Sequence, residues 1–321
     1  MLGATCSVHV SGDGACGRPA DAVERARRAL LGWHDRFTRF DPGSELSRLS
    51  ADVRATVPVS SLMARFARAI AVAGTRSGGL VDATLLPELQ AAGYVGDLGP
   101  GIDLAKTLAL APPRRPARPR SAPGWRFIHA DVERRLVRRP PGVTLDSGGL
   151  AKGLFADVLA AALASHTRFA VVCAGDLRVG GTEGAPRRVD VESPFDGRVL
   201  HSYELACAGV ATSGIGRRSW LGADGAPAHH LLDPASGRPA FTGVVQATAI
   251  APTALEAEWR AKAAVLSGPA GARSWLPHGG LVVLDDGRQM LLPERRAAVP
   301  SGLPPRGGQG RTAWAPSRRR V

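Results

Sequence analysis

Residues 146–157 read DSGGLAKGLFAD and constrain the fold more than any other stretch of the chain. Val143 and Leu145, just before them, are typical of a strand, and two consecutive glycines allow a tight turn. Apolar residues then recur at helical spacing, at Ala151, Leu154, Phe155, Val158, Leu159, Ala162 and Leu163. The stretch therefore predicts a strand, a Gly-Gly turn and the start of a buried helix.

A turn of this kind leaves backbone N–H groups and the positive end of a helix beside a small gap, which suits a phosphate. Lys152, in the first turn of the predicted helix, adds a cation there. The same pattern also fits an ordinary strand-to-helix connection that binds nothing. The stretch alone leaves both interpretations open.

Length and composition limit the class of protein. The chain has 321 residues, of which 44% are hydrophobic, enough for a substantial core. No apolar run reaches about 18 residues, and the first residues lack a basic start followed by an apolar segment, so we expect no membrane span, no signal peptide and a cytoplasmic location. Cys6, Cys16, Cys173 and Cys207 lack metal-ligand spacing, which argues against a zinc site and a disulfide framework.

The net charge of +13 would suit a nucleic-acid-binding protein, but it is diffuse. Lysine occurs only at positions 106, 152 and 262, so the excess is nearly all arginine. It is concentrated in the Pro/Arg-rich residues 112–120 and in the terminal residues 318–320, and both segments are predicted to be solvated and poorly ordered. We therefore expect no nucleic-acid partner.

Periodicity and turn residues predict the remaining elements. A capping-box-like pair, Asp21 and Glu24, predicts the start of a long helix, and Ser60 predicts the start of a second one. Residues 125–128 and 136–138 are expected to form a hairpin, and residues 253–266 a last helix. Further strands are expected at residues 4–10, 169–173, 188–191, 203–205, 211–214 and 229–232, and a hairpin turn at residues 285–287. We assign residues 1–299 to one domain with an irregular connection at about 96–123, and residues 300–321 to a basic, disordered tail.

Residues 230–237 read HLLDPASG and place a histidine three residues before a tight turn. A rigid strand end could hold His230 as a general base, because a near-neutral pKa suits the deprotonation of a hydroxyl. The bland interpretation is a purely structural turn. His229 should point to the opposite face if the segment is a strand.

Together these patterns resemble the ApbE family of flavin transferases, which are FAD:protein FMN transferases. Residues 146–157 resemble the family pattern Asp-Leu-Gly-Gly-Ile-Ala-Lys-Gly-x-x-x-Asp, with Ser147 and Leu150 as departures, and residues 230–237 match His-x-x-Asp-Pro-x-x-Gly in full. Similarity in the same order continues through residues 2–5, 39–49, 81–84 and 211–214. The resemblance spans residues 1 to about 295.

The resemblance implies an α+β fold, a single compact unit of mixed sheets and helices in two lobes with FAD in a cleft between them. It also implies a reaction in which the FAD pyrophosphate is cut, FMN passes to a threonine hydroxyl of an acceptor flavoprotein, and AMP leaves. His230 and Lys152 are the implied catalytic residues. The implied FAD-binding residues are Asp82, Thr84, Asp146, Gly148, Gly149, Asp176, Thr212, Ser213 and Asp233.

The chain departs from the family at two places. Where the family has Asn-x-Gly-Gly-Asp, this chain keeps only Gly175 and Asp176. The family's Ala-Asp-x-x-x-Thr, which supplies magnesium ligands, appears here with Glu258 and Lys262 in place of Asp and Thr. With the Ala151 carbonyl, these are the implied positions of a Mg²⁺ site.

Three outcomes follow for that site. We expect a retained but weaker Mg²⁺ site, because one ammonium cannot clamp several phosphate oxygens as an octahedral ion does. Alternatively, Lys262 occupies the place of the ion, or Glu258 and Lys262 form only a surface salt bridge. For the whole chain, the alternatives to transfer are an FAD-binding protein or slow FAD pyrophosphatase of the same fold, and a basic nucleic-acid-associated protein.

Overall fold

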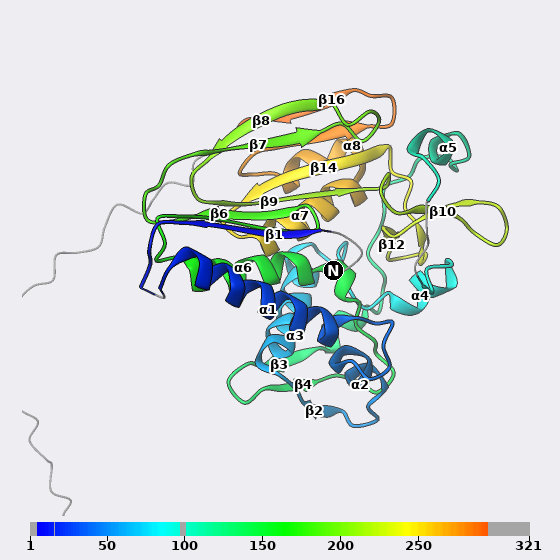
Figure 1. Ribbon diagram of the computed structural model, residues 1–321. Helices are drawn as coiled ribbons and strands as arrows, with labels where there is room; N and C mark the ends of the chain where they lie inside the picture. The colour runs from blue at the N-terminus through cyan, green and yellow to red at the C-terminus, as the bar shows by residue number, and fades with distance from the viewer. Residues whose placement is uncertain (1–4, 16, 97–100, 295–321) are drawn as a thin grey trace, which may run out of the picture.

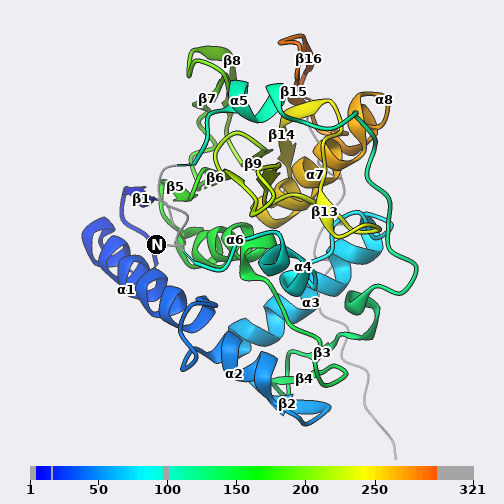
Figure 2. The same ribbon diagram turned by 90° about the vertical axis from the view of Figure 1, so that its right-hand side faces the viewer.

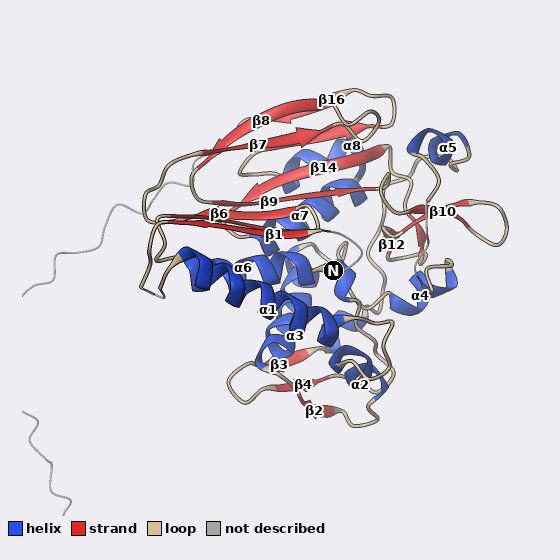
Figure 3. Ribbon diagram, in the orientation of Figure 1, coloured by secondary structure: helices blue, strands red, loops and turns tan. Residues whose placement is uncertain are grey.

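The computed structural model describes residues 5–15, 17–96 and 101–294. It is α+β, as the resemblance implied, with one large sheet, several small sheets and helices in separate layers (Figures 1 and 3). The predicted tail, residues 300–321, and the family-like residues 2–4 lie outside the described residues. No helix in the described part of the chain is both long and apolar enough to cross a bilayer.

A seven-stranded antiparallel sheet forms the upper layer in Figure 1. Its strands, in spatial order, are β1 (Cys6–Ser11), β5 (Arg168–Cys173), β6 (Asp176–Gly180), β9 (Ala208–Gly214), β14 (Val244–Ala251), β15 (Gly280–Leu284) and β16 (Gln289–Leu292). Every residue of β14 is buried, which fits a central strand covered on both faces.

Helices α6 (Ala151–Leu163) and α7 (Ala254–Leu266) cover one face of this sheet. The ribbon of β7 (Arg187–Glu192) and β8 (Val199–Leu205) covers the other, and Figure 2 shows the sheet between this ribbon and α7 with α8 (Gly268–Ala272). The apolar residues of the ribbon join those of β9 and β14 in one core cluster.

The lower layer holds α1 (Pro19–Phe37), α2 (Glu45–Ala51), α3 (Ser61–Arg76) and a sheet of β2 (Thr56–Pro58), β4 (Leu136–Arg138) and β3 (His129–Asp131). Phe37 of α1 meets Phe66 of α3 at 5.3 Å and Phe155 of α6 at 5.0 Å between ring centroids. These edge-on contacts join the two layers through α6.

Short elements lie beside both layers, on the right of Figure 1. They are α4 (Leu86–Ala91), α5 (Leu104–Ala109), and the hairpins of β10 (Ser219–Leu221) with β11 (Pro227–His229) and β12 (Leu232–Asp233) with β13 (Arg238–Pro239). Three 3₁₀ turns pack on the longer helices: η1 (Gly124–Phe127) on α3, η2 (Ser147–Gly149) on α6, and η3 (Arg273–Trp275) on α7 and α8.

Two helix starts were predicted correctly, one from the capping residue Ser60 and one from the periodicity of residues 253–266, and both have a side-chain cap. The Ser60 side chain accepts a hydrogen bond from Met63 N at 3.2 Å, and that of Thr253 accepts one from Glu256 N at 3.1 Å. The capping box at Asp21 was wrong. Helix α1 begins two residues earlier at Pro19, because proline already has the φ of a first helical turn.

Residues 125–127 belong to η1 rather than to a strand, and the partner of β4 in the hairpin is β3. The reason lies in the tertiary packing of Trp125. The Trp125 ring lies so close to Gly74 of α3 that a Cβ at position 74 would come within 2.3 Å of it. Packing against a helix therefore overrides the strand propensity of tryptophan.

The Pro/Arg-rich segment is irregular, as predicted, but it is not a loose solvated run. Helix α5 lies inside the connection at about 96–123 that was predicted to be irregular, so that prediction was wrong at residues 104–109. The Pro/Arg-rich segment after this helix is held to the body of the protein along its length. Arg115 N donates to Phe241 O at 2.9 Å, Ala117 N donates to Leu266 O at 2.8 Å, and Arg114 pairs with Asp285 at 2.6 Å. The prolines keep the backbone extended, so the N–H groups between them reach these acceptors.

Candidate active site

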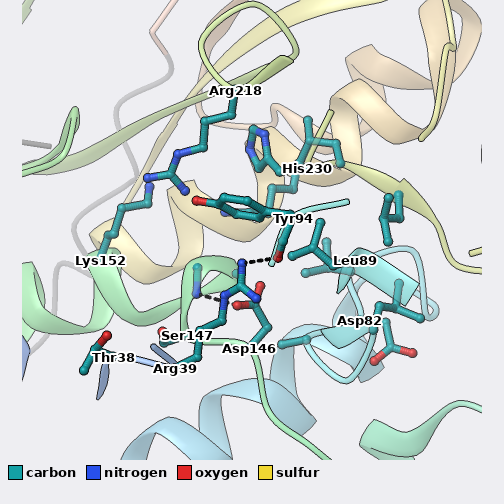
Figure 4. A pocket seen from close by; sticks show the side chains of 18 of the residues that line it. Thr38, Arg39, Asp82, Leu89, Tyr94, Asp146, Ser147, Lys152, Arg218 and His230 are labelled. Atoms are coloured by element: carbon teal, nitrogen blue, oxygen red, sulfur yellow. Dashed lines mark hydrogen bonds between the residues drawn. The ribbon is translucent and has the colours of Figure 1, made fainter. Parts of the chain in front are cut away.

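A cavity of about 620 Å³ lies between the helical layer, helices α6 and α7, and the short elements (Figure 4). Its volume is in the range of small-ligand sites. Charged residues on its wall include Arg39, Asp82, Asp146, Lys152, Arg218 and Lys262, and His230 also lines it; apolar ones include Leu80, Leu85, Leu89 and Leu232. The cavity thus combines an apolar part with several cations.

The Gly-Gly turn forms part of the wall. Asp146 N donates to Ala83 O at 2.8 Å, and a Cβ on Gly149 would lie 3.3 Å from the Ala83 Cβ, so glycine permits this close approach. Gly148 N donates to Asp146 Oδ1 at 3.2 Å, and Gly149 N donates to Asp146 O at 3.4 Å. Both glycine amides therefore already have acceptors inside the turn, unlike the free amides that the sequence predicted.

Aromatic and guanidinium groups stack beside the turn. The Arg39 guanidinium lies 4.4 Å from the Tyr94 ring centroid and 4.5 Å from that of Phe40, and it donates to Tyr94 O at 2.8 Å. Figure 4 shows the Tyr94 side chain between Arg39 and Asp146 on one side and Arg218 and His230 on the other. A flat, cationic and aromatic wall of this kind suits an aromatic ring that carries polar edges.

His229 and His230 point in different directions. His229 is fully buried, 4.7 Å from the Phe241 ring, and it does not line the cavity, whereas His230 does. The predicted continuous strand is broken at residues 230–231, between β11 and β12. Burial, and then the positive charge of Arg218, lower the pKa of His230 well below its usual value. The ring is therefore neutral near pH 7, and its Nδ1 has no hydrogen-bond partner among the described residues.

Four charged side chains form a buried cluster at the base of the cavity. Lys152 of α6 pairs with Asp176 at the start of β6, and its Nζ lies 3.2 Å from Glu258 Oε1. The same oxygen accepts a hydrogen bond from Lys262 Nζ at 3.0 Å, while Glu258 Oε2 accepts one from Gly153 N at 2.9 Å. Asp176 and Glu258 are completely buried, and both lysines line the cavity.

Each member of this cluster shifts the pKa of its neighbours. Burial works against the charge on Lys152, but Asp176 and Glu258 raise its pKa above the usual value. Burial likewise works against the Glu258 carboxylate, and Lys152 with Lys262 lowers its pKa. Burial raises the pKa of Asp176 to about 6, although Lys152 opposes this, and burial lowers that of Lys262.

Asp82 has one carboxylate oxygen that is buried without a partner among the described residues. Its Oδ1 accepts hydrogen bonds from the Thr84 N–H at 2.8 Å and from the Thr84 hydroxyl at 2.5 Å. Its Oδ2 is buried and has no partner in the described structure, and burial raises the pKa of Asp82. The residue lines the cavity, but this oxygen is not exposed to it.

A family model described as "ApbE family" matches residues 2–284. The chain belongs to the ApbE family. A FAD:protein FMN transferase of Klebsiella pneumoniae (strain 342) is 29% identical over 277 residues, which is 82% of this chain and 76% of that protein. One of Escherichia coli (strain K12) is 32% identical over 162 residues, which is 49% of this chain and 46% of that protein.

Solved ApbE structures share the fold. The ApbE protein of Thermotoga maritima aligns with a TM-score of 0.71 at 23% identity, covering 91% of this chain and 94% of that one. The flavinyl transferase ApbE of Pseudomonas stutzeri aligns with a TM-score of 0.70 at 22% identity, covering 92% of each chain.

Seven of the predicted site residues line the cavity: Asp82, Asp146, Gly148, Gly149, Lys152, His230 and Lys262. Asp176 and Glu258 do not line the cavity themselves, but they contact Lys152 and Lys262, which do. Ala151 is completely buried. Thr84 does not line the cavity, but its hydroxyl donates a hydrogen bond to Asp82. These positions agree with an ApbE-like site, and the roles of the residues remain predictions.

Three predicted ligand-binding residues lie elsewhere. The Thr212 hydroxyl bonds to that of Thr248 at 2.8 Å, and neither Thr212 nor Ser213, both on β9, lines the cavity. Asp233 accepts hydrogen bonds from Arg118 N at 2.7 Å and from the Ser236 hydroxyl at 2.7 Å. Its carboxylate is used to fix the turn before Gly237 and to anchor residue 118, so it does not face the cavity.

Arg39, Tyr94 and Arg218 line the cavity but were not predicted as site residues. Arg39 belongs to residues 39–49, which resemble the family, and this resemblance was the one sequence signal that could have identified it as a site residue. Tyr94 and Arg218 lie in irregular segments with no periodicity, 55 and 179 residues after Arg39 (94 − 39 and 218 − 39), so only the fold brings them together.

The residues at the implied Mg²⁺ position do not fit such an ion in this chain. Magnesium needs six oxygen ligands at about 2.0–2.1 Å. Here Glu258 Oε1 lies between two ammonium groups and Oε2 accepts from Gly153 N, so three of the roughly four lone-pair sites of this carboxylate already face donors. Within the described ranges, no three His, Cys, Asp or Glu side chains gather closely enough to hold a metal ion.

Proposed function

We propose that this chain is an FAD:protein FMN transferase that attaches FMN to a threonine hydroxyl of an acceptor flavoprotein and releases AMP. The observation that carries the proposal is the single cavity that joins His230 to Lys152, Lys262 and an aromatic wall. The family membership and the names of the curated relatives support the same reaction.

In this reaction the acceptor oxygen forms a bond to the FMN phosphorus, while the bond from that phosphorus to the bridging oxygen breaks. The electron pair of the broken bond stays on the AMP phosphate, and the hydroxyl proton passes to His230. A neutral imidazole is the form that can accept this proton. A bound pyrophosphate would raise the low pKa of His230 and make it a stronger base.

The remaining cavity residues bind and orient FAD. Lys152 and Lys262 would neutralise the pyrophosphate and the charge that develops on the leaving phosphate. Tyr94 and Arg39 would pack against a ring of the dinucleotide. The apolar part of the wall would exclude water from the phosphorus.

The test is incubation of the purified protein with FAD and a candidate acceptor flavoprotein, followed by intact-mass measurement of the acceptor. The expected result is a mass gain of one FMN group and an equal amount of AMP. The matched control is the acceptor with its modified threonine changed to valine, which should gain nothing. Release of FMN and AMP at the same rate with and without acceptor would instead identify an FAD pyrophosphatase.

A further inference from the structure

The Lys262 side chain stands where an ApbE-like site would need a metal ligand, and it is a cation. It is only 9% exposed, and its Nζ donates to Glu258 Oε1 at 3.0 Å from the next turn of α7. Its spacing from Glu258 is four residues, so both side chains project from one face of the helix. This pair is buried at the cavity, which rules out a surface salt bridge.

Glu258 holds two ammonium groups together. Lys152, from α6, approaches the same oxygen at 3.2 Å, and Gly153 N fixes the other oxygen at 2.9 Å. Two positive groups therefore contact one carboxylate where α6 and α7 meet. A divalent ion added here would meet both of them at close range, in a buried region that screens charge poorly.

The cluster of Lys152, Lys262, Asp176 and Glu258 carries two positive and two negative groups, and the two lysines are the members that line the cavity. An ammonium has three N–H donors. The structure gives Lys262 one carboxylate acceptor among the described residues, so it has donors for an anion. The carboxylates, which would repel phosphate, lie behind the lysines.

We propose that Lys262, with Lys152, binds the FAD pyrophosphate in place of a divalent metal ion, so that this chain binds and uses FAD without one. This inference rests on the proposed function for the identity of the ligand. The amides of Gly148 and Gly149 are already bonded within their turn, which leaves the cationic side chains of the cavity wall, Lys152 and Lys262 among them, as donors to phosphate. Glu258 serves as a positioning residue for both ammonium groups.

The experiment measures FAD affinity by calorimetry for the wild type, in excess EDTA and in millimolar Mg²⁺. The expected wild-type affinity is the same within about twofold in both buffers. The Lys262→Met variant should lose about tenfold or more in FAD affinity, because a buried charge contact contributes over 1.4 kcal/mol. Its riboflavin affinity should be unchanged, since riboflavin has no phosphate.

The matched variant carries Glu258→Asp together with Lys262→Thr, which restores the family residues at both positions. It should bind FAD weakly in EDTA and recover in Mg²⁺, whereas Lys262→Arg should keep most of the affinity without metal. Thermal unfolding of each variant identifies any that is misfolded. The comparison of wild-type FAD affinity in EDTA and in Mg²⁺ tests the proposal even if every variant misfolds.

An increase of tenfold or more in wild-type FAD affinity on adding Mg²⁺ would overturn the proposal, as would wild-type affinity in Lys262→Met. The proposed function and this inference can be refuted independently of each other. FAD binding that is equal in EDTA and Mg²⁺, without any transfer to acceptor, refutes the transferase function and leaves the metal-free FAD binding of this inference standing. Transfer that requires added Mg²⁺ supports the function and refutes the inference.

Discussion

At the scale of single residues, the two adjacent histidines differ in what they contact, and their variants should differ accordingly. His230→Ala removes the imidazole from the cavity, so FMN transfer should fall by about a hundredfold or more, while FAD affinity stays within a few-fold. His229→Ala removes a ring packed on Phe241 and should lower stability more than transfer. A larger loss of transfer in His229→Ala, at equal folded fraction, would contradict this assignment.

The pH dependence of stability gives a second test at this scale. Burial lowers the pKa of His229 to about 3, whereas an unfolded histidine titrates near 6.5. Between these values the unfolded chain binds the proton and the folded chain does not, so this residue costs stability as the pH falls from about 6.5 toward 3 and costs nothing above that range.

The matched variant is His229→Asn, whose amide oxygen can replace Nδ1 as the acceptor of Leu231 N, a contact of 3.3 Å in the wild type. Relative to the wild type, it should gain about 1.4 kcal/mol of stability for each pH unit of acidification within this range. Urea unfolding at several pH values measures the difference. A difference that does not change with pH would show that His229 is not buried in its neutral form.

At the scale of elements, Asp157 connects α6 to α7. Its carboxylate accepts hydrogen bonds from Ala254 N at 2.8 Å and Leu255 N at 2.9 Å, and it lies 3.5 Å from Arg178. The side chain of one helix therefore caps the N-terminus of the next. Asp157 is the last residue of the 146–157 stretch, and this contact explains why an aspartate stands there.

Asp157→Ala should lower the free energy of unfolding by about 2 kcal/mol, because two N–H groups at the start of α7 lose their acceptor. It should also weaken FAD binding, since Glu258 and Lys262 stand on the same helix. Asp21→Ala is the control, because its ion pair with Arg18 is exposed and should contribute much less to stability than the Asp157 cap. Equal midpoints in urea for the two variants would rule out the capping role.

The sequence predicted the elements whose signals are local. The cap at Ser60, the helix at residues 253–266, the turn at residues 285–287 and the helix after Leu150 follow from neighbouring residues. The pairing of Glu258 with Lys262 was also predicted from helical spacing. Its burial was not, because Lys152 reaches Glu258 from 106 residues earlier (258 − 152), and no periodicity encodes such a contact.

At the scale of the whole molecule, FAD should stabilise the fold as one unit, because its cavity is lined by both layers. At a concentration of 100 times Kd, a ligand adds about 2.7 kcal/mol to stability, which corresponds to roughly 4–5 °C in Tm for a domain of about 300 residues, because the unfolding entropy is about 2.1 cal/mol/K per residue. Differential scanning calorimetry in excess EDTA should show the full shift with FAD and none with adenosine. A shift confined to one of two separate transitions would indicate lobes that unfold independently.

The arrangement of the large sheet has a consequence for how the chain is made. Strand β1 pairs with β5, and Cys6 stands opposite Cys173, 167 residues later (173 − 6). At 5–20 residues per second, a ribosome needs about 8–33 s to make the intervening chain. During that time β1 has no partner strand, and its backbone N–H and C=O groups are unpaired. We infer that the nascent chain is most prone to aggregation before residue 173 has been synthesised.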